Sequence, residues 1–140
     1  MKKRLTIIQM DVHVNDVEYN YTRVQELLVQ SLSENPDIIV LPETWNTGFY
    51  PSKELINIAD RNGERTKSLL STFAKEHNVN IVGGSVAVAK NDVVFNTSYA
   101  YNREGTLVGK YSKMHGFSPA KEDQYFAGGT HTTHFELDGI

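Results

Sequence analysis

Two charged residues, each placed after a strand-like segment, are the strongest candidates for chemistry. Glu43 follows the apolar run Asp37 to Leu41, and Lys113 follows the β-rich segment Thr106 to Tyr111. Open α/β sheets place their ligand crevice at the carboxyl ends of strands. Burial beside Trp45 would raise the pKa of Glu43 toward the range of a general base, and an ammonium at position 113 would hold a developing oxyanion. Taken singly, each residue is more often an exposed surface charge, so the case depends on the rest of the sequence.

Other polar positions carry weaker signals. Glu122 lies in a polar loop, where a surface acid is the ordinary interpretation. His115 has no partner at the spacing of a zinc site, and His131 and His134 lie in a weakly specified segment, so we predict no metal. Gly83-Gly84 falls inside an expected strand and lacks the rest of a phosphate-loop pattern, so close packing of the strand is the better explanation.

Composition bounds the class of protein. The 140 residues are 39% hydrophobic and 22% charged with a net charge of -3, which fits one globular domain and gives no nucleic-acid-binding surface. No run approaches the ~18 apolar residues that span a bilayer, and the N-terminus lacks the apolar core of a signal peptide. We therefore expect a cytoplasmic protein without nucleic-acid or membrane partners. The sequence has no cysteine, which excludes disulfides, thiolate metal sites and a cysteine nucleophile within these residues.

The hydrophobic pattern predicts an α/β fold, a mixed sheet with helices on one face. Leu5 to Val12 and Asp37 to Leu41 have the composition of buried strands. Apolar residues recur at helical spacing from Val17 to Leu32, and a second helix is expected from Gly63 to His77. The remaining expected strands, 79–88, 93–101 and 106–111, form an antiparallel meander with turns at 91–92 and 102–105.

The end of the sequence predicts an unfinished hairpin. Thr132 to Leu137 has strand character, and Asp138-Gly139 is a preferred hairpin turn, but only Ile140 follows. A hairpin turn without a second strand leaves backbone groups unpaired. We therefore expect residues 1–140 to be one domain that is truncated at its C-terminus.

In their order along the chain, these fragments resemble the nitrilase, or carbon–nitrogen hydrolase, superfamily. Each fragment alone is a weak signal, but the ordered set is specific and covers essentially the whole chain. The set comprises Gln9 and Asp11, Leu41-Pro42-Glu43-Thr44, Gly48-Phe49-Tyr50, Val82-Gly83-Gly84-Ser85, Phe95-Asn96-Thr97-Ser98, Gly105 to Lys110, Tyr111-Ser112-Lys113-Met114-His115 and the Glu122 loop. The bacterial amidases that resemble omega-amidases are the most similar branch.

The resemblance implies a fold, a reaction and roles for three residues. The family fold is a four-layer αββα sandwich, of which this chain would be the N-terminal half. The reaction is hydrolysis of a non-peptide carbon–nitrogen bond, here in the amide of a small carboxylated substrate, without a cofactor and by a homo-oligomer. In the family's Glu–Lys–Cys triad, Glu43 matches the general base and Lys113 the oxyanion-stabilising lysine. Glu122 matches a second glutamate that positions the lysine and the substrate, and the family cysteine would come after Ile140.

Other interpretations stay open at this point. A chain without a nucleophile also fits an inactive fragment or pseudoenzyme that acts as a binding or regulatory module, and a generic α/β binding domain is a third reading. Ser112 or Ser118 as a replacement nucleophile is disfavoured, because a hydroxyl needs a stronger base arrangement than one glutamate. Family members act on amides, nitriles and carbamoyl compounds, and the sequence does not select among them. Coding sequence beyond Ile140 would separate an enzyme from an inactive fragment.

Overall fold

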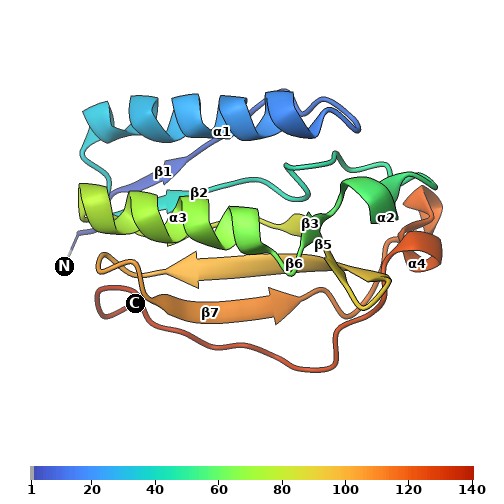
Figure 1. The fold of residues 1–140 in the computed structure, drawn as a ribbon. Coiled ribbons are helices and arrows are strands. Elements are labelled where there is room, and N and C mark those ends of the chain that lie inside the picture. The colour runs from blue at the N-terminus through green and yellow to red at the C-terminus, as the bar shows by residue number, and fades with distance from the viewer. Residues whose placement is uncertain (1) are drawn as a thin grey trace.

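The computed structural model describes residues 2–140, which form a seven-stranded mixed sheet with two long helices on one face (Figure 1). Among these residues no helix is long and apolar enough to cross a bilayer. In chain order the elements are β1 (Leu5–Ile7), α1 (Val17–Ser31), a 3-10 turn (Leu32–Glu34), β2 (Ile38–Val40), α2 (Leu55–Ile58), β3 (Asp60–Arg61), α3 (Glu64–His77), β4 (Asn80–Val82), β5 (Val86–Lys90), β6 (Val93–Tyr101), β7 (Leu107–Ser112), a second 3-10 turn (Ser118–Ala120) and α4 (Glu122–Tyr125).

The strand directions bring segments that are distant in the sequence to one end of the sheet. β1, β2 and β4 pair in parallel. β6 runs antiparallel to β4 and β5 on one side and to β7 on the other. β7 therefore runs in the direction of β2 and β4. The carboxyl ends of β2 and β7 and the first half of β6 consequently lie at the same end of the sheet.

The core lies between the sheet and the helices α1 and α3. Asp16 caps α1, because its carboxylate accepts a hydrogen bond from the backbone of Tyr19. From this helix Tyr21, Val24 and Leu28 enter the core with at most 1% of their surface exposed. Burying a side chain of this size contributes about 1.5–3 kcal/mol, so this apolar stripe holds α1 on the sheet.

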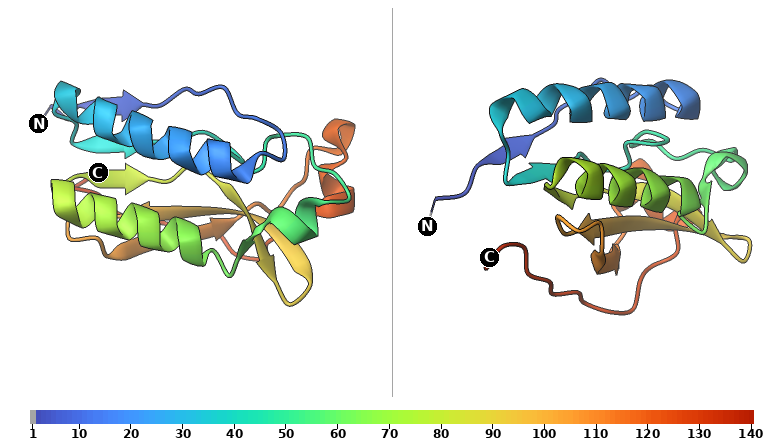
Figure 2. Two further views of the ribbon diagram at one scale, coloured as in Figure 1. Left: turned by 45° about the horizontal axis from the view of Figure 1, so that its top comes forward. Right: turned by 60° about the vertical axis from the view of Figure 1, so that its left-hand side comes forward.

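Within residues 2–140, no helix covers the opposite face of the sheet (Figure 2). Leu5 and Ile7 of β1 are 54% and 69% exposed, and Tyr111 of β7 is 36% exposed. The segment 129–137 runs along β7, where Phe135 contacts Gly109. The chain therefore contains two layers, one of helices and one sheet. The four-layer sandwich that the family resemblance implies stays a prediction.

Most predicted elements are confirmed. α1, α3 and the turn at Asn91-Asp92 form where the sequence indicated, and β6 has the bounds that were expected. The strand predicted over 79–88 is wrong, since β4 ends at Val82 and β5 begins at Val86. The break follows from Gly84, which has φ +58, and a Cβ at this position would lie 1.9 Å from the carbonyl oxygen of Pro42.

The strand expected at Thr132 to Leu137 is also wrong. This segment is extended, but it reaches β7 through the Thr133 hydroxyl, which donates to the Lys110 carbonyl, rather than through a backbone ladder. The short elements α2, β3 and α4 were not predicted, because segments of two to four residues are too short for a hydrophobic period to show.

Candidate active site

The three predicted site residues lie in direct contact at the carboxyl ends of β2 and β7. Lys113 Nζ donates to Glu43 Oε1 at 2.9 Å and to Glu122 Oε2 at 2.8 Å. Glu43 and Lys113 are 70 positions apart in the sequence. They meet because β2 and β7 point the same way and each ends just before its charged residue.

A fourth residue, Asn96, joins the same cluster. Its side-chain Nδ2 donates to Glu43 Oε1 at 3.0 Å and to Glu122 Oε1 at 3.1 Å. Asn96 is 3% exposed and lies on β6. The sequence analysis quoted it in a motif without giving it a role. The available signal was a polar amide inside a β-rich run, since buried polar groups require partners.

Glu122 is buried, which corrects the ordinary interpretation of a surface acid. Its side chain is 2% exposed, and it accepts hydrogen bonds from Lys113, from Asn96 and from the backbone nitrogen of Phe117 at 2.6 Å. The chain returns to the cluster through the 3-10 turn and through Lys121, which has φ +58. Burial alone would raise the pKa of Glu122, but these hydrogen bonds outweigh burial and lower it.

Lys113 is held in its charged form by the same contacts. Burial acts to lower the pKa of Lys113, but hydrogen bonds to Glu122 and Glu43 and their negative charges outweigh this effect and raise the pKa. An ammonium has three N–H bonds, and residues 2–140 use two of them. The third is available to a ligand.

Glu43 is not buried beside Trp45, as the general-base interpretation had assumed, but exposed, as is usual for a loop glutamate. The Glu43 side chain is 45% exposed, whereas Trp45 is fully buried, with its indole N–H donating to the Gly83 carbonyl at 3.0 Å. Thr44 between them has φ +45 and turns the chain so that the two side chains reach different surroundings. Glu43 faces Lys113, and Trp45 packs against Tyr21 in the core.

The backbone around Glu43 is held by Ser85. A β-branched residue such as Thr44 at positive φ is a strained position that costs about 1–3 kcal/mol. The Ser85 hydroxyl accepts from the Thr44 nitrogen at 3.0 Å, and the Ser85 carbonyl accepts from the Trp45 nitrogen at 3.2 Å. The Ser85 nitrogen in turn donates to the Pro42 carbonyl at 3.0 Å. These bonds place the Glu43 carboxylate at the rim of the cluster.

A cavity of about 530 Å³ opens on this cluster, a size suited to a small molecule. Among residues 2–140 no group of three or more histidines, cysteines or acids has the arrangement of a metal site. Ser112 hydrogen-bonds to the Thr97 hydroxyl at 3.0 Å rather than to Glu43. The cavity is lined by Leu41, Glu43, Gly84, Ser85, Asn96, Ser98, Tyr111 and Lys113.

The family model described as carbon-nitrogen hydrolase matches residues 4–138. The chain belongs to the carbon-nitrogen hydrolase family. It is similar to the 2-oxoglutaramate amidase of Bacillus subtilis (strain 168), with 38% identity over 140 residues, which is 100% of this chain and 53% of that protein. It is also similar to an omega-amidase of Homo sapiens, with 29% identity over 81% of this chain and 41% of that protein.

Solved structures of carbon-nitrogen hydrolases share this fold. XC1258 from Xanthomonas campestris, a CN-hydrolase superfamily protein with an arsenic adduct in its active site, superposes with a TM-score of 0.84 and 28% identity. The match covers 98% of this chain and 50% of that one. The carbon-nitrogen hydrolase sequence described here thus spans about half the length of the curated relatives it matches.

Proposed function

We propose that residues 1–140 supply the base and the oxyanion donor of an amidase that hydrolyses the carbon–nitrogen bond of a small carboxylated amide. The observation that carries this proposal is the Lys113 ammonium, held between the Glu43 and Glu122 carboxylates at a cavity of about 530 Å³. A fixed ammonium with one free N–H beside an exposed carboxylate suits acyl transfer, which needs an oxyanion donor next to a base.

In this proposal Glu43 is the general base. Its Oε1 accepts from Lys113 and Asn96, while its Oε2 accepts no hydrogen bond from residues 2–140. Oε2 takes the proton of a cysteine thiol, whose ordinary pKa of about 8.5 leaves it mostly protonated at neutral pH. The thiolate attacks the amide carbon and the carbonyl oxygen becomes an oxyanion. Glu43 then returns the proton to the leaving amine, and a water that Glu43 activates hydrolyses the thioester.

Lys113 is the oxyanion donor, and Glu122 and Asn96 position it. The free N–H of Lys113 donates a hydrogen bond to the developing oxyanion. One such donor typically stabilises the transition state by about 3 kcal/mol. Glu122, itself fixed by the Phe117 nitrogen and Asn96, keeps the ammonium from turning away. Two carboxylates around one lysine also keep it charged through the reaction.

In this proposal the nucleophile lies on a strand that continues the terminal hairpin. Asp138 and Gly139 have φ +52 and φ +82, and Leu137 and Ile140 exchange both backbone hydrogen bonds at 2.9 and 3.1 Å, as in a two-residue hairpin. The Gly129 nitrogen donates to the Lys113 carbonyl, so 129–137 runs antiparallel to β7. A strand that continues the hairpin would return in the direction of β7 and arrive near Lys113 after roughly eight residues. We expect a cysteine there.

The substrate class and the full-length activity are tested together. Two of the relatives named above are a 2-oxoglutaramate amidase and an omega-amidase, which supports a carboxylated amide as substrate. Ammonia release by the full-length protein should be at least ~100-fold more efficient in kcat/KM with 2-oxoglutaramate than with butyramide, because a site built for a carboxylate rejects an analogue without it. Equal rates would contradict the substrate class, and no release from either amide would contradict the amidase.

A second candidate rests on the absence of cysteine from the sequence. If the reading frame ends at Ile140, the same cavity would serve an inactive binding or regulatory module. Sequencing the gene past the Ile140 codon decides between the two: a nearby cysteine supports the enzyme, and a stop codon supports the module. A cytoplasmic location and a homo-oligomer of the full-length protein stay part of the proposal.

A further inference from the structure

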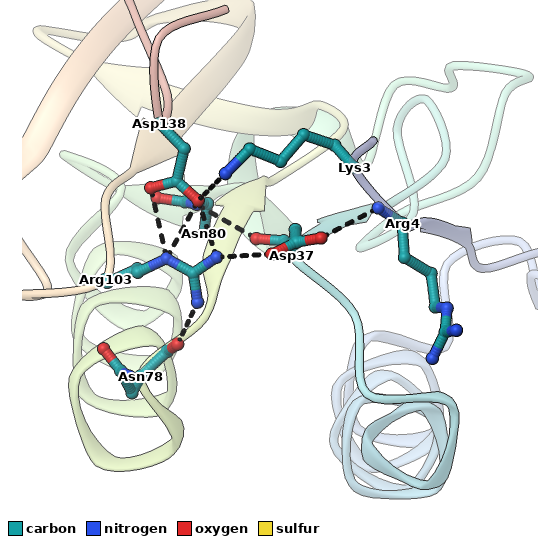
Figure 3. Close-up of polar contacts among 7 residues, drawn as sticks. All are labelled: Lys3, Arg4, Asp37, Asn78, Asn80, Arg103 and Asp138. Carbon is teal, nitrogen blue, oxygen red and sulfur yellow. Dashed lines mark hydrogen bonds and ion pairs between the residues drawn. The ribbon is translucent and has the colours of Figure 1, made fainter. Parts of the chain in front are cut away.

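Four charged side chains form an ion cluster (Figure 3). It lies at the end of the sheet opposite to Glu43 and Lys113, because those two residues follow β2 and β7. The ion cluster consists of Lys3, Asp37, Arg103 and Asp138. Lys3 precedes β1, Asp37 precedes β2, Arg103 follows β6 and Asp138 lies in the terminal hairpin turn. The roles that the family resemblance implies for Glu43, Lys113 and Glu122 do not involve this ion cluster.

Arg103 is the centre of the ion cluster. Its Nε donates to both carboxylate oxygens of Asp138 at 3.1 and 3.0 Å, and its Nη2 donates to Asp138 Oδ2 at 2.6 Å. The same Nη2 donates to Asp37 Oδ1 at 2.9 Å, and Nη1 donates to the Asn78 carbonyl at 2.6 Å. Lys3 Nζ adds a bond to Asp138 Oδ2 at 3.1 Å. Arg103 thereby joins the hairpin turn to the starts of two central strands.

These contacts differ from ordinary surface ion pairs. The four side chains are 15% to 33% exposed, and an arginine fork on a carboxylate has a fixed geometry. The hydrogen bonds from Arg103, with those from Asn80 and Lys3, lower the pKa of Asp138 well below its usual range. A backbone hydrogen bond from Arg4 is the main cause of a lowered pKa at Asp37. The ion cluster is therefore fully charged at neutral pH.

The ion cluster anchors the point from which the chain turns back. The segment 129–137 makes few hydrogen bonds along β7: Thr133 donates to Lys110 of β7, and Gly129 donates to Lys113 just after it. At the far end of this segment, Asp138 makes four hydrogen bonds to Lys3 and Arg103. A shift of one residue in the register of a returning strand turns every side chain to the other face of the sheet. An anchor at Asp138 would therefore fix the register of a strand that continues the hairpin.

We propose that the ion cluster, through Asp138 and Arg103, positions the catalytic nucleophile by fixing the turn and the register of the strand that follows Ile140. This inference rests on the proposed function, because it requires a nucleophile on that strand. Asp138 and Arg103 are positioning residues, since they act through the strand and lie at the other end of the sheet from the cavity.

The test compares two turn aspartates in the full-length protein. Asp138→Asn keeps the size of the side chain and its tolerance of positive φ, but removes the charge. The matched control is Asp92→Asn, at an exposed aspartate with φ +61 in the β5–β6 turn, which forms no ion pair within residues 2–140. With 2-oxoglutaramate, Asp138→Asn should lower kcat by at least ~10-fold with KM within about twofold, because small misplacements of a reacting group are costly. Asp92→Asn should leave both unchanged.

Conservative replacement separates positioning from folding. Arg103→Met should match the loss of kcat in Asp138→Asn, and Arg103→Lys, which keeps the charge, should recover part of it. Rates are measured at a temperature at which circular dichroism shows each variant fully folded. A merely structural ion cluster would lower Tm in Asp138→Asn and leave kcat unchanged. That result, in an active wild type, would overturn the proposal.

Hydrogen exchange supplies a readout that does not depend on activity. The Ile140 amide donates to the Leu137 carbonyl within the turn, so it should exchange at least ~10-fold faster in Asp138→Asn than in wild type or Asp92→Asn. Unchanged exchange would overturn the proposal whether or not the protein is active. If wild type releases no ammonia while exchange responds as expected, the proposed function fails and the anchoring of the turn by the ion cluster stands.

Discussion

Replacing Lys113 with methionine removes the ammonium between Glu43 and Glu122 while keeping an apolar stem. Glu122, whose side chain is 2% exposed, then loses its charged partner. Only the Phe117 nitrogen and Asn96 still donate hydrogen bonds to it. Removing one member of a buried ion pair costs about 3–5 kcal/mol, because the remaining charge is uncompensated. Since the Lys113 side chain is 29% exposed, we expect the lower end of that range, about 3 kcal/mol of unfolding free energy.

The same substitution has a second consequence that depends on Glu122. In the Lys113→Met background, Glu122→Gln removes the stranded charge and should recover about 2 kcal/mol, a coupling within the range measured for residues in one network. Activity should not recover, because the oxyanion donor is still missing. We expect kcat at least ~100-fold below wild type in both Lys113→Met and the double variant.

Urea denaturation at pH 7, followed by circular dichroism, and initial rates of ammonia release measure these effects in the full-length protein. Lys110→Met is the control, because Lys110 is an exposed lysine on β7 without an ion pair among residues 2–140. Its free energy of unfolding should stay within ~0.5 kcal/mol of wild type. If Lys113→Met is as stable as Lys110→Met, or if Glu122→Gln recovers nothing, the reasoning about a buried charge pair is refuted.

Three further predictions concern the base, the isolated chain and pH. Glu43→Gln keeps the shape and removes the base, so kcat should drop at least ~100-fold while the protein stays folded; turnover near wild type would exclude Glu43 from the triad. The 140-residue chain alone exposes the apolar sheet face of Leu5 and Ile7, so size-exclusion chromatography should show aggregates and mass spectrometry should find no thioester with an amide substrate; a monodisperse monomer with a sharp thermal transition would contradict this. Glu122 has a lowered pKa in the folded state, so its stabilisation is present above the unfolded pKa of about 4.3 and is lost as pH falls through the folded pKa. The free energy of unfolding of wild type should therefore decline more steeply below pH ~5 than that of Glu122→Gln, and parallel declines would show that Glu122 contributes nothing.

Local pattern was sufficient for the long helices and for β6. The apolar residues of α1 recur at helical spacing, and the structure places Tyr21, Val24 and Leu28 in the core as that spacing requires. The β6 prediction succeeded for a similar reason, since nine consecutive residues are bounded by turn residues on both sides. Local pattern failed at Gly83-Gly84, where the apolar run continues but the approach of Pro42 from another segment breaks the strand.

The same reasoning could not predict which side chains at the site are buried. The sequence left burial open at both glutamates: the general-base interpretation of Glu43 assumed burial beside Trp45, and a polar loop suggested a surface acid at Glu122, whereas Glu43 is 45% and Glu122 2% exposed. The types of the neighbouring residues do not reveal either outcome. Thr44 turns Glu43 away from Trp45, and the loop that ends at Glu122 folds under Lys113 and Asn96. Asn96 had no assigned role because its two partners lie 53 and 26 positions away.

The sequence by itself determined the types and order of the reactive groups, the α/β class and, through its resemblance to carbon–nitrogen hydrolases, the expected roles of Glu43, Lys113 and Glu122. Only the tertiary structure decided that these groups are in contact and which of them is shielded from water. It also decided that Asn96 joins them and that the ion cluster forms at the other end of the sheet. The reason is physical. A carboxylate's environment depends on hydrogen bonds and charges brought within about 3 Å by strand direction and register, and a linear pattern carries no information on which distant segments those are.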